Sequence, residues 1–263
     1  FHGQADINNR LLRHVGPAFS EDPLRILRVA RFAARYYHLG FTIAPETLAL
    51  MKDMVANDEL KTLTKERIWL EIEKCLKANS LHLFLDVLDE IDALADVLPI
   101  LPTWSKAQSK KVTNANVNLA NLETNINSEQ LTIYQFCLCL EHSNPQELKQ
   151  IEQTLKIPSI YANALRDHKL LQQFLLLEYP TAKDILTFFN QIDLWRRPER
   201  LTLLIELLEY TQSHDQITHT LQECASITQT ITAQQVIALG FQGAAIKTGL
   251  ETTRIHAIEK WLS

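Results

Sequence analysis

Glycine and cysteine are scarce in this chain of 263 residues, and long apolar runs are missing. Six glycines leave little material for a glycine-rich phosphate-binding loop. Four cysteines are too few for a disulfide scaffold in a chain of this length, so we expect a reducing, cytoplasmic setting. No stretch approaches the ~20 apolar residues that a membrane-spanning helix needs, which predicts that the protein has no membrane partner.

What is present has the proportions of an ordinary globular protein. Hydrophobic residues make up 46% and charged residues 22%, with a formal net charge of −5, which excludes a fully disordered or collagen-like chain. The length allows one or two domains with a sizeable core. The chain begins at Phe1 without an apolar signal segment, and we interpret it as part of a longer protein.

Apolar residues recur at helical rather than alternating spacing along nearly the whole chain. Only residues 1–15 and 41–43 have patterns compatible with extended structure. We therefore predict an all-α protein with at most a short extended segment at the N-terminus. The predicted helices cover about 20–38, 45–57, 64–78, 80–93, 130–142, 145–155, 159–178, 181–193, 198–212, 232–239 and 251–262.

One region, residues 102–129, departs from this pattern. It contains six asparagines and several Ser and Thr residues, with little periodicity. This composition predicts a linker or irregular connection. It would separate a helical part over 16–101 from a second helical part over 130–263.

Basic residues are concentrated near the N-terminus. Residues 1–37 hold six arginines, no lysine and three acids, a pattern that indicates a polyanionic partner bound there. A solvated arginine face with ordinary ion pairs is the alternative. The arginines are Arg10, Arg13, Arg25, Arg28, Arg31 and Arg35.

The helix predicted over 20–36 carries the most specific pattern. At 100° per residue, the last four of these arginines fall within an arc of about 120°. Ser20 is the predicted N-cap, and Glu21 and Asp22 would follow in the first turn, where acids are favoured. Asp22 and Arg25 are three residues apart, so both side chains can face one pocket.

An Asp–Arg pair of this kind can read the edge of a base. A carboxylate accepts from an exocyclic amino group, and a guanidinium donates to a ring nitrogen. Cytosine and adenine present that combination, whereas uracil and guanine present the reverse. One Asp–Arg pair can therefore accept C and A and reject U and G, because a mismatch leaves buried polar groups unpaired. Arginines further along the same face would reach a triphosphate.

Three sequence runs resemble the class II bacterial tRNA nucleotidyltransferases, the CCA-adding enzymes. LLRHVGPAFSEDPLRILRVARFAARYYHLGF (11–41) resembles the nucleotide-recognition helix of that family. HGQADINNRLLRHV (2–15) is similar to the end of its catalytic head, and LTKERIWLEIEKCL (63–76) to its ERxxxE helix. The resemblance is dense over about residues 1–100 and weaker beyond.

This resemblance implies a fold of neck, body and tail helical domains. Residues 1–15 would end the catalytic head, 16–101 would form the neck, and 130–263 would form the tRNA-binding body and tail. Asp22 and Arg25 would form the amino-acid template for the base, while Arg28 and Arg31 would contact the nucleotide. The remaining implied roles are structural. Glu21 would help to set the helix N-terminus, and the neck would be braced by Glu66, Arg67 and Glu71.

Several parts of the family pattern are not found in the sequence. The Gly-Gly-x-x-Arg-Asp loop, the metal-binding Asp-x-Asp and the Arg-Arg-Asp segment would precede Phe1. We therefore expect no catalytic residue and no metal site in this chain, which alone would be inactive. Mg²⁺ would be held in the complete enzyme by residues outside it. Leu140-Glu141 replaces the His-Asp pair of a phosphohydrolase, so we do not expect that activity.

Two smaller clusters have alternative readings. Cys137, Cys139 and His142 fall short of four metal ligands, so we expect a buried core there. WRRPER (195–200) places three arginines beside an aromatic residue, which favours a helix start with surface arginines over contact with an RNA backbone.

The expected function follows from the resemblance. The complete enzyme would extend tRNA 3′ ends using CTP and ATP, with this chain supplying nucleotide selection and tRNA binding. The alternatives are a poly(A) polymerase of the same family and a non-catalytic helical RNA-binding module. Incorporation of C by the complete protein would exclude a pure poly(A) polymerase.

Overall fold

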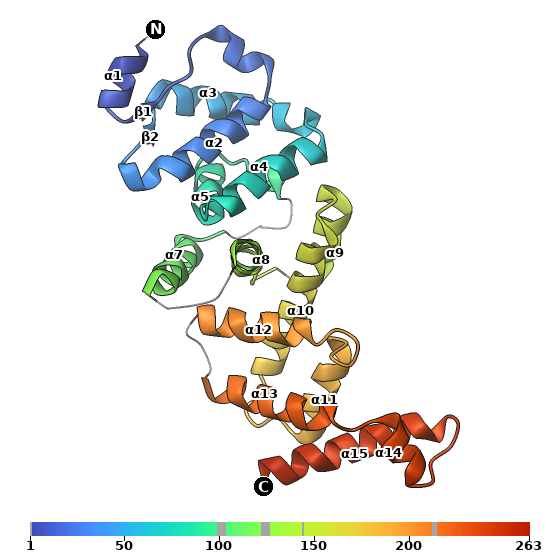
Figure 1. The fold of residues 1–263 in the computed structure, drawn as a ribbon. Helices are drawn as coiled ribbons and strands as arrows, with labels where there is room; N and C mark the ends of the chain where they lie inside the picture. Colours follow the sequence, from blue (N-terminus) through green and yellow to red (C-terminus); the bar gives the residue numbers. More distant parts are fainter. Residues whose placement is uncertain (1, 99–103, 122–126, 144, 212–214) are drawn as a thin grey trace. The chain divides into compact units, whose positions relative to one another are not determined.

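A computed structural model of the protein describes residues 2–98, 104–121, 127–143, 145–211 and 215–263 (Figure 1). The chain divides into two compact units, Phe1–Leu165 and Arg166–Ser263. Both are built from helices, which confirms the all-α prediction.

The first unit contains short helices and a two-stranded sheet. Its main elements are α1 (Gly3–Asn8), β1 (Leu11–Leu12), α2 (Leu24–Tyr36), β2 (Thr42–Ile43), α3 (Pro45–Ala56), α4 (Lys65–Lys77), α5 (Leu81–Glu90), α6 (Leu94–Val97), α7 (Lys106–Asn121), α8 (Ser128–Cys139) and α9 (Pro145–Leu155). The described residues of this unit also form 3₁₀ helices at Pro17–Glu21, Tyr37–Leu39 and Glu59–Thr62.

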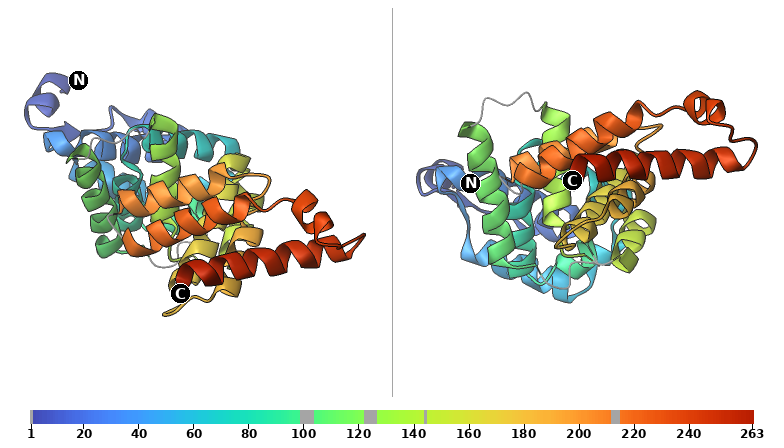
Figure 2. Two further views of the ribbon diagram at one scale, coloured as in Figure 1. Left: turned by 60° about the horizontal axis from the view of Figure 1, so that its bottom comes forward. Right: turned by 90° about the horizontal axis from the view of Figure 1, so that it is seen from below.

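The second unit consists of six helices within its described residues, the first of which begins in the first unit. These helices are α10 (Ser159–Leu175), α11 (Ala182–Gln191), α12 (Glu199–Tyr210), α13 (Asp215–Gln229), α14 (Ala233–Ala238) and α15 (Ala245–Leu262). In the views of Figure 2 the long helix α15 runs beside α13, and it also packs against α11 and α14. Ile258 of α15 is fully buried in the core between them.

Helix α2 forms the centre of the first unit. Its apolar face includes Ile26, Leu27 and Ala30, all with no exposed surface, and it packs against α4 and α5. Arg28 and Arg35 are exposed, whereas Arg25 and Arg31 are partly buried. The amphipathic pattern predicted for this segment is therefore observed.

The two strands flank α2 in the sequence and pair in parallel. Leu11 lies opposite Thr42, and Leu12 opposite Ile43. The amide of Thr42 donates to the carbonyl of Arg10 at 2.9 Å, which ties the segment before α2 to the segment after it. Extended structure occurs within both predicted regions, although residues 3–8 form helix α1 instead.

The structure corrects the prediction of an irregular linker over 102–129. Lys106–Asn121 forms α7, which packs against α5 and α8, and the division between units falls at Leu165 instead. Val112 and Ala115 supply its buried face, which the surrounding polar residues concealed in the sequence. Residues 102–103 and 122–126 lie outside the described residues. The helix α13 also lies where no helix was predicted, because its Thr-rich sequence weakens the helical pattern.

All four cysteines are free and buried. Burial raises the pKa of Cys75 and Cys139, and it raises the pKa of Cys224 to about 11. These thiols therefore stay protonated at neutral pH. Among the described residues, no helix combines the length and apolarity needed to cross a membrane.

Candidate functional site

The candidate site begins where the chain enters α2. The 3₁₀ helix Pro17–Glu21 ends just before Asp22, whose backbone is extended. The Oδ1 atom of Asp22 accepts a hydrogen bond from the amide of Leu24 at 3.1 Å. Asp22 thus satisfies one of the free amides at the helix start, the role that had been predicted for Ser20.

Arg67 of α4 holds the Asp22 carboxylate from the other side. Its Nη2 atom lies 3.0 Å from Oδ1 and 2.9 Å from Oδ2. Burial alone would raise the pKa of Asp22, but the Leu24 amide and Arg67, with a contribution from Arg28, lower it below its ordinary value. Asp22 is therefore a carboxylate at neutral pH and only accepts hydrogen bonds.

One acceptor position of this carboxylate remains open. Each carboxylate oxygen can accept about two hydrogen bonds. Oδ1 accepts from Leu24 and Arg67, whereas among the described residues Oδ2 accepts only from Arg67. The Asp22 side chain is 30% exposed, so Oδ2 can receive one further donor from outside.

Arg25 lies one turn along α2 and is anchored separately. One nitrogen of its guanidinium donates to the carbonyl of Ala18, in the preceding 3₁₀ helix. Within the described part of the chain no hydrogen bond joins the side chains of Asp22 and Arg25. The two side chains thus lie at the same end of α2 and are partly exposed. Asp22 is held by Arg67, and Arg25 is held by the carbonyl of Ala18.

Arg31 has a different environment from that expected of a nucleotide contact. Its Nε atom lies 2.5 Å from Oε2 of Glu71 on α4, and its guanidinium covers the ring of Phe32 at 4.2 Å. Lys74 contacts the other Glu71 oxygen at 2.7 Å. The side chains of Arg31 and Glu71 are only 12% and 2% exposed, so this is a buried pair that joins α2 to α4.

The pKa of Glu71 reflects these two partners. Burial favours the neutral acid, but the hydrogen bonds from Lys74 and Arg31 outweigh it and lower the pKa below its ordinary value. Glu71, for which a bracing role was implied without a named partner, thus joins α4 to Arg31 of α2. Lys74 was not predicted, although its position three residues after Glu71 on a helix is a signal for such a contact.

The remaining predicted residues are at the surface. Arg28 is exposed, and Glu21 is exposed at the end of its 3₁₀ helix. Glu66 pairs with Lys156 at 2.7 Å, with both side chains more than half exposed. Such a surface pair contributes little to stability. Asp22, Arg25 and Arg28 thus lie near the start of α2 with part or all of their side chains exposed, whereas the Arg31 side chain is mostly buried.

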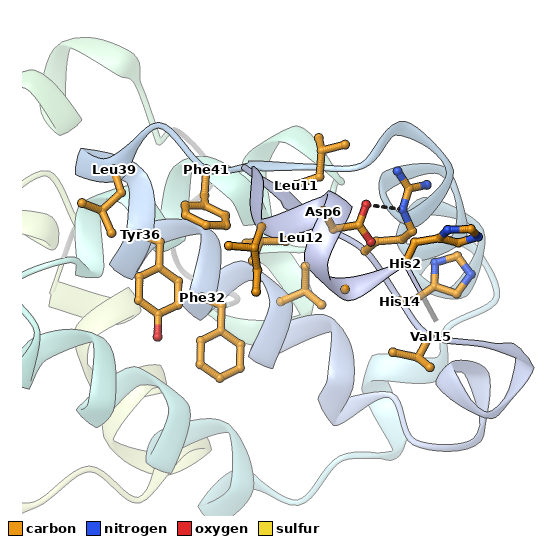
Figure 3. Close-up of a pocket in the computed structure, with 14 residues that line it drawn as sticks. His2, Asp6, Leu11, Leu12, His14, Val15, Phe32, Tyr36, Leu39 and Phe41 are labelled. Atoms are coloured by element: carbon orange, nitrogen blue, oxygen red, sulfur yellow. Dashed lines mark hydrogen bonds and ion pairs between the residues drawn. The ribbon is translucent and has the colours of Figure 1, made fainter. Parts of the chain in front are cut away.

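An apolar pocket of about 640 Å³ lies along α2 (Figure 3). Phe32, Tyr36 and Phe41 form one end, and His2 and His14 lie at the other. The rings of Phe32 and Tyr36 are stacked, with centroids 6.0 Å apart. None of the four predicted nucleotide-binding residues lines this pocket, which sequence reasoning did not anticipate.

The described residues do not form a site that fits Mg²⁺. They contain no group of three or more His, Cys, Asp or Glu side chains placed to hold a metal ion. Cys137 and Cys139 are buried in the α8 core, and Glu141 pairs with Lys111 at 2.6 Å. We therefore derive no catalytic step through a metal on these residues.

Comparisons with known proteins agree with this helical arrangement. A family described as "Probable RNA and SrmB- binding site of polymerase A" matches residues 40–104. The CCA-adding enzyme of Actinobacillus succinogenes is 36% identical over 288 residues, covering 99% of this chain and 71% of that protein. The multifunctional CCA protein of Tolumonas auensis is 34% identical over 301 residues, covering 98% and 71%.

Solved structures share the fold at lower identity. A CCA-adding enzyme in complex with CTP matches with a TM-score of 0.63 at 19% identity, covering 98% of this chain and 61% of that chain. The Thermotoga maritima CCA-adding enzyme complexed with tRNA matches with a TM-score of 0.61 at 18% identity, covering 99% and 63%.

The fold and the sequence relatives together define a protein related to the tRNA nucleotidyltransferases. The chain belongs to the family of CCA-adding enzymes, whose curated relatives it matches over about 71% of their length.

Proposed function

We propose that this chain is the nucleotide-selecting and tRNA-binding portion of a CCA-adding enzyme that extends tRNA 3′ ends using CTP and ATP. The observation that supports it best is the ionised Asp22 carboxylate with one open acceptor position at the exposed start of α2. The family supports tRNA and nucleoside triphosphates as partners, and a cytoplasmic location belongs to the same proposal.

Base selection follows from the groups at this position. Oδ2 of Asp22 accepts from the exocyclic amino group of cytosine or adenine. The Arg25 guanidinium has five N–H donors, and its contact with Ala18 leaves others free to donate to a ring nitrogen. Uracil or guanine would place a carbonyl against the carboxylate, which leaves the base carbonyl and the open position of Oδ2 without a donor.

The other residues of the site have distinct roles. Arg28 contacts the nucleotide phosphates in this proposal, which its exposure on α2 supports. Arg31 was expected to do the same, but its buried pair with Glu71 makes it a positioning residue that fixes α2 on α4. Arg67 positions Asp22 and holds it ionised. Phosphoryl transfer itself is assigned to residues outside this chain.

The test is nucleotide choice by the full-length protein. We expect Asp22→Ala to slow C and A addition and to reduce discrimination against UTP and GTP by roughly 10²-fold, since a hydrogen bond to a charged group contributes about 1.5–3 kcal/mol. Asp53→Ala on α3, which also removes one exposed carboxylate, is the matched control. Unchanged exclusion of UTP and GTP in Asp22→Ala would refute the template assignment.

A poly(A) polymerase remains the second candidate, because the matched family at residues 40–104 carries the name of polymerase A. The same assay separates the two functions. Incorporation of C supports the CCA-adding enzyme, whereas incorporation of A alone supports the poly(A) polymerase. A chain that binds RNA but whose full-length protein adds no nucleotide would support the non-catalytic module.

A further inference from the structure

A second group of arginines surrounds a buried carboxylate in the second unit. Asp167 of α10 is only 2% exposed. Arg166 lies beside it, and Arg197 and Arg200 approach it from the start of α12. Three guanidinium groups therefore act on this carboxylate, and two of them, those of Arg197 and Arg200, also act on Asp193.

The distances between Asp167 and its charged partners are longer than those of a typical ion pair. The Nη2 atom of Arg166 lies 3.3 Å from Oδ1, and Nε of Arg200 lies 3.5 Å from Oδ2. Charge-assisted N–H···O contacts are usually about 2.7–2.9 Å long. Burial raises the pKa of Asp167 despite the three neighbouring guanidinium groups. One carboxylate therefore leaves much of the surrounding positive charge without a close anionic partner.

The neighbouring side chains of Arg196 and Trp195 already have partners within the protein, so they are not part of the candidate site. Arg196 pairs with Asp193 at 2.9 Å, so these two charges cancel. The face of Trp195 is covered by Arg254 at 3.5 Å, and its Nε1 donates to Asn190 at 2.7 Å. This aromatic ring is thus part of the packing and is not offered to a base.

Exposure identifies which arginines face solvent. The side chain of Arg200 is 14% exposed and also contacts the carbonyl of Ile192, so it belongs to the support of the cluster. The Arg166 side chain is 52% exposed, and Arg197 is exposed. Within the described part of the chain, Arg197 forms no ion pair at contact distance. It interacts with Asp167 and Asp193 only through longer-range attraction.

We propose that Arg166 and Arg197 form a binding site for phosphodiester groups of an RNA backbone. The more buried Asp167 and Arg200 position these two side chains. The inference rests on the proposed tRNA-binding function and assigns it to specific residues of the second unit. Arginine suits this ligand because its planar donors match two phosphate oxygens at once. The site reads no bases, so it contributes affinity without sequence preference.

The experiment measures binding of a tRNA transcript to the full-length protein over a range of salt concentrations. We expect the double variant Arg166→Gln/Arg197→Gln to bind roughly tenfold more weakly at low salt. The slope of log affinity against log salt should fall by about 1.5, since each lost phosphate contact lowers it by about 0.7–0.9. The matched control is Arg196→Gln/Lys183→Gln, which removes two positive charges from exposed positions of the same unit.

Each outcome has a distinct meaning. An equal loss in the control would show general electrostatic attraction and overturn the site, as would an unchanged affinity in the double variant. Failure of the unaltered protein to bind tRNA would refute the proposed function itself. ATP titrations separate the two sources of phosphate: we expect unchanged ATP affinity in the double variant, and its loss would overturn the assignment to RNA.

Discussion

The two arginine-rich regions of the molecule differ in how their charge is balanced. In the first unit Arg67 is matched by Asp22, and Arg31 by Glu71, at hydrogen-bonding distances of 3.0 Å or less. In the second unit three guanidinium groups surround the single carboxylate of Asp167 at longer distances. Close contact with a carboxylate fixes the direction of a side chain, which the proposed base selection requires. An arginine without a close carboxylate partner is not held in one direction, and such positive charge suits a repeating polyanion.

The largest effect should come from breaking the buried pair of the first unit. Glu71→Gln leaves Arg31 without its anion, and we expect a loss of about 3 kcal/mol in the free energy of unfolding. Urea unfolding measures it. Glu73→Gln, which removes a carboxylate in a more exposed pair with Lys77, should cost less than about 0.5 kcal/mol. Equal losses in the two variants would contradict the importance of burial and close pairing at Glu71.

A smaller effect is expected when the charge is kept and the geometry is changed. Arg25→Lys retains the positive charge but lacks a planar group that can reach Ala18 and a base together. We expect C and A addition by the full-length protein to fall roughly tenfold, measured as kcat/KM for each nucleotide. Arg35→Lys, on an exposed position of the same helix, is the control. Full activity in Arg25→Lys would show that direction does not matter at this site.

The smallest expected effect concerns how the free energy of unfolding changes with pH, which should differ between Glu71 in the first unit and Asp167 in the second. The lowered pKa of Glu71 means that its stabilisation is lost as the pH falls through the folded-state pKa, below 4.5. The raised pKa of Asp167 gives the opposite sign: its contribution is present at low pH and declines as the pH rises from 3.8 through the folded-state pKa.

Urea midpoints measured at several acid pH values test this contrast. The advantage of the unaltered protein over Glu71→Gln should shrink towards low pH, whereas its advantage over Asp167→Asn should shrink as the pH rises. Parallel pH trends for the two variants would show that both carboxylates are balanced in the same way.

The sequence allowed the helical class and the amphipathic pattern of α2 to be predicted, because local periodicity reports a buried face directly. It did not locate the start of that helix. Ser20 and Asp22 are both good capping residues, but Ser20 lies within a 3₁₀ helix that ends at Glu21, Pro23 is the N-cap, and Asp22 accepts from the Leu24 amide. The asparagine-rich segment was misread because Val112 and Ala115 are small apolar signals among many polar residues.

The partners of the site residues required information beyond local pattern. Arg31 and Glu71 are 40 residues apart, and Asp22 and Arg67 are 45 apart, so spacing alone could not join them. The resemblance to a family indicated that Arg67 and Glu71 belonged near the neck. Only the three-dimensional arrangement distinguishes Arg31, which is buried with a partner, from Arg28, which remains exposed on the same helix.

The burial of every thiol has a practical consequence for following the protein in solution. Alkylating reagents attack the thiolate, so the folded molecule should react slowly, and labelling will report excursions that open the interior. Cys224 lies in the second unit and the other three cysteines in the first. The order in which these positions acquire label would therefore reveal which half of the molecule opens more readily.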